Sequence, residues 1–353
     1  MLQFIYDALP ARVIFGTGSL EKLPDEIARL GATRALVLST PEQRESATDI
    51  ASRLGPKAAG IFDRAVMHVP IETAQQARDE AKRLGADCCV AIGGGSTTGL
   101  AKAIALVSDL PILAIPTTYA GSEMTPIWGL TEAGVKRTGR DPRVLPKTVI
   151  YDPALTVTIP PQLTATSGMN AIAHCVEALY AKDANPIISL IAEEGIRAFA
   201  QSLWVVVQEP DNLEARSLAL YGAWLGGVSL GAVGMALHHK LCHTLGGSFN
   251  LPHAETHTVV LPHAAAYNSE AAPDAMARVA RALGAESAAE GLYNLAVNIG
   301  APLSLASIGM QQEDLDRAAD LATQNPYYNP RAVTREGIRQ LLDDAFHGRR
   351  PRG

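Results

Sequence analysis

The first third of the chain alternates short apolar runs with helical segments, and this alternation narrows the fold more than any other feature. The run 34–39 is almost continuously apolar, as strands are when helices cover both faces of a parallel sheet. Segments such as 71–84 and 100–107 predict helices between the strands. Residues 11–116 therefore predict a Rossmann-like parallel sheet with crossover helices. The predicted strands are 11–15, 34–39, 59–62, 88–92 and 111–115.

The pattern changes after about residue 158, where strand signals nearly vanish and segments rich in Ala and Leu predict helices. Ile159-Pro160-Pro161 is a natural boundary. We therefore predict an α/β dinucleotide-binding domain over 1–158 and an all-α domain over 159–353. A cleft between two such domains is a preferred place for a ligand. The predicted helices are 162–181, 186–202, 212–232, 234–246, 256–267, 272–283, 286–298 and 312–322.

Composition limits the classes of partner. The 353 residues are 47% hydrophobic and 19% charged, which suits a globular chain with an ample core. The net charge is −6, and the only basic run is the Arg-rich tail at 349–352, so we expect no nucleic-acid partner. Four cysteines without a CxxC pair, no signal peptide and no apolar run of membrane-spanning length predict a cytoplasmic protein with no membrane partner.

A glycine loop follows the strand 88–92 and precedes a helix. Glycines let backbone N–H groups approach a ligand closely, and a helix N-terminus favours anions, so this loop suits a pyrophosphate. It is not a Walker loop, because Gly99 is followed by Leu100 rather than Lys. The alternative is a tight strand-to-helix turn without a ligand. The candidate cofactor-binding residues here are Gly93, Gly94, Gly95, Ser96 and Thr97.

Hydroxyl side chains mark two further strand ends. Thr117, Thr118 and Ser122 follow the strand 111–115, where doubly wound sheets place ligands, although they could equally cap the next helix. Thr40 follows the strand 34–39, at the position where NAD-specific folds often carry an acid for the ribose hydroxyls. Because Thr40 is uncharged, we expect either NADH or NADPH to bind.

Six of the nine histidines lie between Gly234 and Asn268. His239 and His243 are four residues apart and share a helix face, and Asn170 and His174 repeat this spacing. His253 follows a turn signal and is expected in a loop that folds back to the same place. These groups are the inventory of a divalent metal site or its remnant, while unrelated core histidines remain the alternative.

Several motifs together resemble the iron-containing alcohol dehydrogenase superfamily, which has a dehydroquinate synthase-like fold. They are GGGS after one strand, PTT and GSE after the next, NAIAH, HHKLCH and the later LPH, and they span nearly the whole chain. The resemblance implies that the first domain binds a nicotinamide dinucleotide and that His243 lies near the nicotinamide. It implies metal-ligand positions at Asn170, His174, His239 and His253.

Asn170 departs from the superfamily pattern, which has an Asp there. This departure, with GLAKAIAL, VLPKTVIYDPALT and the motif at 325–331, is similar to one branch, the maleylacetate reductases. That resemblance implies NADH- or NADPH-dependent reduction of the C=C of maleylacetate to 3-oxoadipate, in the breakdown of aromatic compounds. We expect the catalytic residues to be Asn170, His174, His239, His243 and His253. We also expect no tightly bound metal, and a homodimer. Candidates for the substrate carboxylates are Lys136, Arg137, Arg140 and Arg331.

Three other interpretations remain open. A metal-dependent alcohol or aldehyde dehydrogenase of the same superfamily would keep Asn170 as a ligand. A lyase on the dehydroquinate synthase-like fold would use the dinucleotide only transiently. A nucleotide-binding protein without enzymatic activity would leave the histidines without a role.

Overall fold

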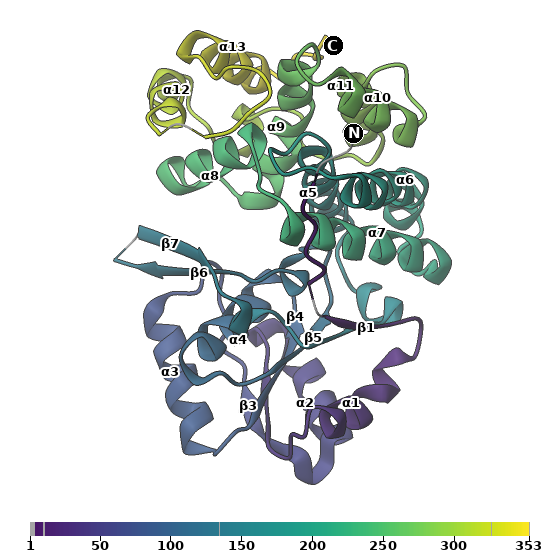
Figure 1. Cartoon of the computed structure of the whole chain (residues 1–353), viewed down its shortest axis with the longest axis vertical. Coiled ribbons are helices and arrows are strands. Elements are labelled where there is room, and N and C mark those ends of the chain that lie inside the picture. Colours follow the sequence, from purple (N-terminus) through teal and green to yellow (C-terminus); the bar gives the residue numbers. More distant parts are fainter. Residues whose placement is uncertain (1–3, 10, 134, 326, 353) are drawn as a thin grey trace. The chain divides into compact units, whose positions relative to one another are not determined.

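The structure is a computed structural model that describes residues 4–9, 11–133, 135–325 and 327–352 (Figure 1). It divides into two compact units. One unit comprises Ala8–Thr158, and the other runs from Ile159 to the C-terminus and includes the N-terminal segment up to Asp7.

The first unit is built on a parallel sheet, which confirms the predicted fold class. Six strands are hydrogen-bonded in the order β1-β8-β5-β4-β2-β3, and every neighbouring pair is parallel. The strands are β1 (Arg12–Phe15), β2 (Ala35–Leu38), β3 (Ala58–Phe62), β4 (Cys88–Gly93), β5 (Ile112–Pro116) and β8 (Thr148–Tyr151). The helices are α1 (Leu23–Arg29), α2 (Arg44–Leu54), α3 (Ile71–Arg83) and α4 (Gly95–Ser108).

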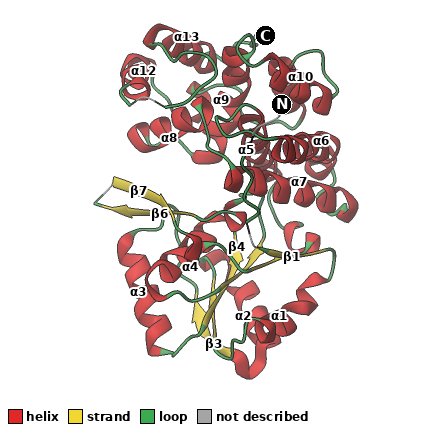
Figure 2. Ribbon diagram, viewed as in Figure 1, coloured by secondary structure: helices red, strands yellow, loops and turns green. Residues whose placement is uncertain are grey.

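Successive residues of the central strands serve two separate cores. Val37 and Val90 pack with the helices α1 and α2 on one face of the sheet. Leu36 and Ala91 pack with α3 and α4 on the opposite face (Figure 2). Burial on both faces requires every position of a strand to be apolar, which explains the continuous run in β2.

Two elements of this unit escaped prediction. An antiparallel hairpin, β6 (Ile127–Glu132) and β7 (Val135–Arg140), stands apart from the main sheet. Its strand β6 is only half-buried and mixes polar with apolar residues, so the sequence carries no strong strand signal. The strand β8 was also missed, although it inserts between β1 and β5.

The second unit is helical throughout the residues that the structure describes, as predicted. Its last helix was not predicted. Thr334 is the N-cap of that helix, and the Thr334 hydroxyl accepts a hydrogen bond from the amide of Gly337. The helices are α5 (Pro161–Leu179), α6 (Pro186–Gln208), α7 (Leu213–Ala232), α8 (Leu237–Phe249), α9 (His253–Asn268), α10 (Pro273–Leu283), α11 (Ala288–Asn298), α12 (Leu315–Thr323) and α13 (Arg335–Phe346).

The helix α5 forms the centre of this unit, because residues 164–179 are all buried. A separate apolar core joins α8, α9, α12 and α13 through side chains such as Leu241, Val260 and Leu342. The helix α9 packs against both α5 and α8, and these three helices carry His174 and the six histidines between Gly234 and Asn268.

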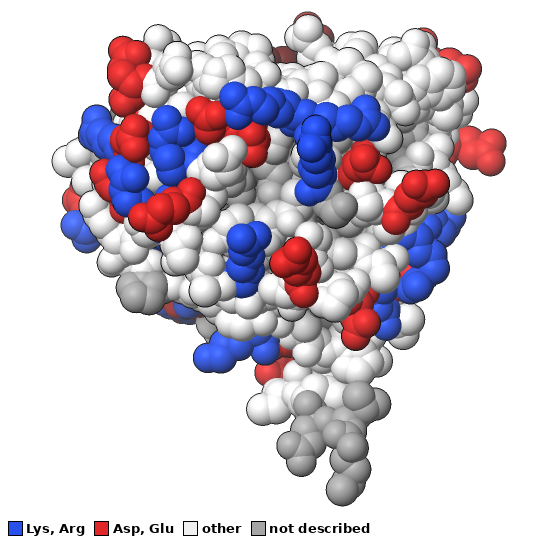
Figure 3. Space-filling model, turned by 90° about the horizontal axis from the view of Figure 1, so that it is seen from above, with Lys and Arg blue, Asp and Glu red and all other residues white. Residues whose placement is uncertain are grey.

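The surface carries charges of both signs. On the face shown in Figure 3, Lys and Arg side chains are interspersed with Asp and Glu. Among the described residues no single helix is long and apolar enough to cross a bilayer, and α7 and α8 meet that criterion only together, as a pair bent by 94°.

Candidate functional site

The sheet has a topological switch point between β2 and β4. From β2 the chain runs outward to β3 at one edge, and from β4 it runs the other way to β5 and β8. Doubly wound sheets bind ligands at the carboxyl ends of the strands beside such a switch point. The predicted cofactor loops follow β2, β4 and β5, which are neighbours in the parallel sheet, so all three loops lie at the carboxyl ends of the strands beside the switch point.

The glycine loop packs closely against its neighbours at this edge. Gly93 has φ +145°, and a Cβ built there would lie 2.6 Å from both Gln43 Oε1 and Thr97 Oγ1. The amide of Thr117 donates to the carbonyl of Gly93 at 3.0 Å. The Gln43 side chain donates to Thr117 Oγ1 at 2.8 Å and thereby bridges the loops after β2 and β5. Only glycine fits position 93 without displacing these contacts.

The helix α4 begins at Gly95, five residues earlier than predicted. Its N-cap residue is Gly94, which offers no side chain to its first amides, and the buried Thr97 Oγ1 has no protein partner among the described residues. Free amides at a helix N-terminus beside a vacant hydroxyl suit the oxygens of a phosphate. The loop therefore fits a dinucleotide.

The segment after β5 is held by a buried lysine. The Lys102 ammonium donates to the carbonyls of Ser122, Thr125 and Ile127 at 2.6 to 2.8 Å. Burial lowers the pKa of Lys102 to about 7. Thr118 packs against the glycine loop, because a Cβ at Gly94 would lie 2.9 Å from Thr118 Oγ1.

Thr40 lies at the end of β2 and precedes the short 3-10 helix η2 (Pro41–Gln43). The pKa of Glu42 is lowered by its own backbone amide and by a hydrogen bond from the Thr40 side chain. An exposed carboxylate thus lies beside the predicted ribose position. The sequence analysis missed both Glu42 and Gln43, although their place directly after β2 was a signal.

The second unit brings the predicted histidines together. The ring centres of His174 on α5 and His239 on α8 lie 5.0 Å apart. His243 stacks with His253 at 6.2 Å. His243 and His253 are exposed, whereas His174 and His239 are buried. Exposed imidazoles thus form the rim of the cluster, and buried imidazoles form its interior.

One detail of the prediction was wrong. His253 is the first residue of α9 and not part of a loop. The preceding helix ends at Asn250, which adopts the left-handed conformation with φ 55°, and Pro252 then occupies the N-cap position of α9. The αL cap of α8 followed by Pro252 makes the connection between α8 and α9 short, so α9 starts three residues earlier than predicted.

Three residues of the cluster were not predicted. His257 is buried, lies 4.2 Å from His253 and 4.8 Å from His239 by ring centres, and has no protein partner at either ring nitrogen among the described residues. His238 lies 4.9 Å from His257. Glu177 Oε2 lies 2.7 Å from His239 Nδ1, within hydrogen-bond distance.

Helical spacing was the signal that could have found two of them. His257 lies four residues after His253, and Glu177 lies seven after Asn170 and three after His174, so each shares a face with a predicted residue. His238 faces differently from His239, and sequence spacing alone does not place it in the cluster.

The buried imidazoles of the cluster are neutral at pH 7. Burial, and then the neighbouring imidazoles, lower the pKa of His174, His239 and His257 well below the ordinary value. Burial lowers the pKa of His238 to about 4. Each neutral ring offers one N–H donor and one acceptor.

The donor set fits a divalent metal ion in atom type but not in charge. Asn170 Oδ1 and His239 Nε2 are buried without a protein partner in the described part of the chain. The nitrogens that approach within 4.8 Å of one another belong to His238, His239 and His257, rather than to the expected set. The nearby carboxylate, Glu177, is already occupied by other donors. A set of neutral donors does not offset the charge of an ion, so it favours weaker binding than the same set with a carboxylate ligand.

Two of the cations proposed for the substrate have other partners. The Arg331 guanidinium donates to the Tyr267 carbonyl at 3.1 Å and lies over the Tyr267 ring. Arg137 pairs with Glu132 at 3.3 Å. The side chain of Lys136 lies outside the described residues, and Arg140 also has an interaction within the chain.

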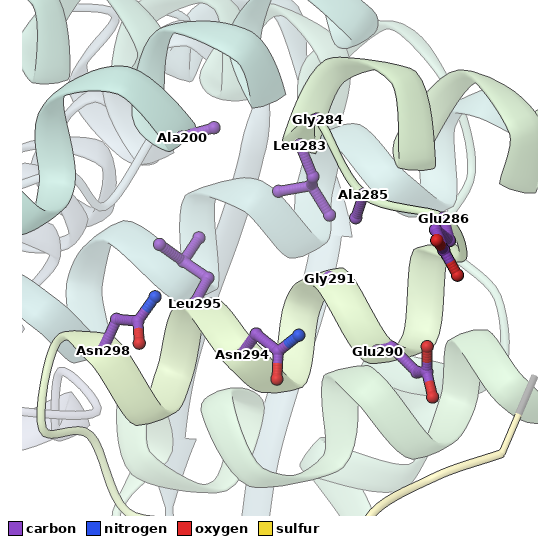
Figure 4. A pocket seen from close by; sticks show the side chains of 10 residues that line it. All are labelled: Ala200, Leu283, Gly284, Ala285, Glu286, Glu290, Gly291, Asn294, Leu295 and Asn298. Atoms are coloured by element: carbon purple, nitrogen blue, oxygen red, sulfur yellow. The ribbon is translucent and has the colours of Figure 1, made fainter.

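A separate cavity of about 480 Å³ lies beside α11 (Figure 4). Glu286, Glu290 and Asn294 line it, and it contains no predicted site residue. Its carboxylates would repel an anionic ligand, so it does not suit a dicarboxylate.

Comparison with known proteins agrees with the motifs. The profile of the iron-containing alcohol dehydrogenases matches residues 10–153, and that of the C-terminal part of the same family matches 164–346. A maleylacetate reductase of Burkholderia cepacia is 63% identical over 351 residues, which are 99% of this chain and 100% of that protein.

Two solved structures are similar along the whole chain. A putative alcohol dehydrogenase of Ralstonia eutropha JMP134 has a TM-score of 0.98 and 64% identity, with 100% of both chains covered. The maleylacetate reductase of Rhizobium sp. strain MTP-10005 has a TM-score of 0.97 and 56% identity, with 99% of this chain and 100% of that chain covered. The chain therefore belongs to the iron-containing alcohol dehydrogenase family and, within it, to the group of the maleylacetate reductases.

Proposed function

We propose that this protein reduces the C=C of maleylacetate to 3-oxoadipate with NADH or NADPH. The observation that carries the proposal is the buried cluster of neutral imidazoles on α5, α8 and α9, with an amide where the family expects a carboxylate. The full-length likeness to proteins named maleylacetate reductase supports the choice of substrate.

The cofactor loop has a binding role. The amides at the start of α4 and the Thr97 hydroxyl would hold the pyrophosphate, while Gln43, Thr117 and Lys102 keep the surrounding loops in place. When bound, the nicotinamide supplies a hydride. We propose that both dinucleotides are accepted, with the exposed carboxylate of Glu42 favouring NADH because it repels a 2′-phosphate.

The chemistry of the substrate suits imidazoles. Addition of a hydride to the alkene carbon β to the ketone leaves an enolate, whose negative charge lies mainly on the former ketone oxygen. An imidazole N–H can donate to that oxygen, and His174, His253 and Asn170 lie on the helices that form the cluster. Protonation of the α-carbon then completes the reduction.

The exposed rim suits the proton transfer. His243 and His253 are exposed and stacked, so either can exchange protons with water, which the buried rings cannot do directly. We assign the proton donor to His243, with His253 beside it.

We further propose that the reaction needs no tightly bound metal. An enolate is a more stable anion than the alkoxide formed when a simple carbonyl is reduced, so hydrogen bonds from imidazoles suffice to stabilise it. The neutral donor set is consistent with this proposal. The homodimer and the cytoplasmic location remain predictions.

Product analysis tests the proposed function. Purified protein is incubated with maleylacetate and NADH, and the product is identified by mass spectrometry and NMR. 3-Oxoadipate formed in equal amount to the NADH consumed supports the proposal. A hydroxy acid that retains the C=C would instead show carbonyl reduction, as in the metal-dependent alternative.

A further inference from the structure

Glu177 occupies a position that the proposed function leaves unexplained. It is fully buried near the C-terminal end of α5, one turn beyond His174, and it is the one acidic or basic residue among the described residues of that helix, histidine aside. A buried carboxylate is costly unless its oxygens receive hydrogen bonds. Its partners therefore indicate why it is there.

Glu177 receives three backbone hydrogen bonds from the start of another helix, and the Tyr180 hydroxyl also donates to it, at 3.4 Å. The amides of Ala236 and His239 donate to Oε2 at 3.1 and 3.3 Å, and the amide of His238 donates to Oε1 at 2.8 Å. These amides belong to the N-cap residue of α8, Ala236, and to the first turn of that helix, and Ala236 offers no side-chain acceptor. Glu177 thus caps α8 from α5 and fixes the relative position of the two histidine-bearing helices.

The same carboxylate sets the tautomer of His239. Three backbone amides stabilise the ionised carboxylate of Glu177, although burial raises its pKa. His239 Nδ1 lies 2.7 Å from Oε2, and an ionised carboxylate oxygen can only accept. The proton of neutral His239 must therefore be on Nδ1, and the lone pair is on Nε2. This Nε2 atom is buried and has no protein partner in the described part of the chain.

The neighbouring ring supports this assignment with the opposite tautomer. His238 Nε2 lies 2.9 Å from the carbonyl oxygen of His257, which can only accept, so His238 carries its proton on Nε2. His238 Nδ1 then holds a lone pair and can share the proton of His239 Nδ1, 3.4 Å away. The three contacts are mutually consistent only with this arrangement.

We propose that Glu177 is a positioning residue, which presents His239 to the cluster with Nε2 as a hydrogen-bond acceptor. His239 in this form cannot stabilise the enolate oxygen, so that task falls to the other imidazoles of the cluster. Instead, Nε2 of His239 receives a hydrogen bond from a donor inside the cluster, such as a bound water or the His257 ring 4.8 Å away.

The tautomers can be measured directly in the unmodified enzyme. Protein labelled with ¹⁵N-histidine is studied by long-range ¹⁵N–¹H correlation NMR at pH 7.5, with His238→Gln and His239→Gln used to assign the signals. We expect His239 protonated at Nδ1 and His238 protonated at Nε2. A wild-type His239 protonated at Nε2 overturns the proposal.

Kinetics of two variants then separate positioning from folding. Glu177→Gln and Glu177→Asp should lose the Nδ1–H form of His239 and lower kcat by about ten- to hundredfold, the usual scale for an orienting partner. The KM for NADH should change by less than about twofold, because the cofactor loop lies in the other unit. Glu193→Gln is the control, because Glu193 pairs with Arg278 and Arg281 away from the histidines.

The kinetic test of Glu177 rests on the proposed function, because it measures turnover of maleylacetate. Two results distinguish a failure of the positioning role from a failure of the proposed function. The expected tautomers in a protein that does not reduce maleylacetate would refute the proposed function and leave the positioning role intact. A lower kcat in Glu177→Gln with an unchanged His239 tautomer would show that Glu177 only caps α8. If neither variant folds, the wild-type spectrum still decides the tautomer.

Discussion

The glycine loop after β4 gives a graded prediction, because the space around its three glycines differs. A Cβ at Gly95 would meet the Ala120 Cβ at 3.7 Å, an ordinary contact. At Gly94 it would lie 2.9 Å from Thr118 Oγ1 and 3.2 Å from Thr118 Cγ2, so Thr118 must move. At Gly93 it would lie 2.6 Å from two side chains, in a backbone conformation that other residues rarely adopt.

These distances predict three different outcomes. Gly95→Ala should fold with the stability of the wild type. Gly94→Val should fold, displace Thr118 and fill space next to the pyrophosphate, raising the KM for NADH by about tenfold, or about 1.4 kcal/mol. Gly93→Ala should destabilise the protein by about 1 to 3 kcal/mol through backbone strain alone. That cost corresponds to a fall in Tm of several degrees.

The assays are steady-state kinetics with varied NADH, and thermal unfolding followed by circular dichroism. Gly95→Ala is the matched control for the loss of a neighbouring glycine. A folded Gly94→Val with the wild-type KM for NADH would remove this loop from the cofactor site. Equal effects of all three substitutions would refute the steric reasoning.

The remaining predictions concern the proton donor, the cofactor and pH. His243→Ala should lower kcat by about a hundredfold, whereas His347→Ala, an exposed histidine on the surface near α13, should leave kcat unchanged; equal kcat values in both variants would contradict the assigned role. NADH and NADPH should both support turnover, within about a hundredfold in kcat/KM, with Glu42→Gln improving NADPH and Thr40→Asp favouring NADH; strict refusal of NADPH by Glu42→Gln would show that the ribose lies elsewhere. The free energy of unfolding should fall as pH falls from 7.5 to 5.5. Burial lowers the pKa of His238 and His263 in the folded state to about 4, so below about pH 6.5 these two histidines bind protons in the unfolded chain but not in the folded one. Each of them then lowers the free energy of unfolding by about 1.4 kcal/mol per pH unit. Urea unfolding at the two pH values measures this difference, and equal free energies of unfolding would contradict it.

The parallel sheet could be predicted because its signal is local. Burial on both faces makes the central strands β2, β4 and β5 apolar along their length, and the glycines after β4 mark where the chain turns into α4. The hairpin of β6 and β7 carries no such signal, because it is partly exposed and its residues are mixed. Its pairing depends on contacts that spacing does not encode.

The candidate site could be predicted in part. Spacing placed His239 with His243 on one helix face and Asn170 with His174 on another, and the structure brings His174 and His239 together. Spacing could not show that Glu177 contacts the start of α8. Ala236 is 59 residues away from Glu177 in the sequence, and their contact depends on how the helices pack. Similarly, the orientation of His238 is set by the His257 carbonyl.

The absence of a required metal is the claim that most sharply separates this account from its alternative. Asn170 replaces the one carboxylate of the family's ligand set, so Asn170→Asp should restore charge and raise the affinity for Fe²⁺ or Zn²⁺. This variant serves as the positive control for metal binding.

The most direct measurement is the rate of NADH oxidation with freshly made maleylacetate, with and without a chelator, on protein whose metal content is known. The account predicts less than one metal ion per chain, an unchanged rate in chelator, and tighter metal binding in Asn170→Asp. Stoichiometric iron or zinc in the unmodified protein, with activity lost on removal of the metal and regained on its return, would contradict it.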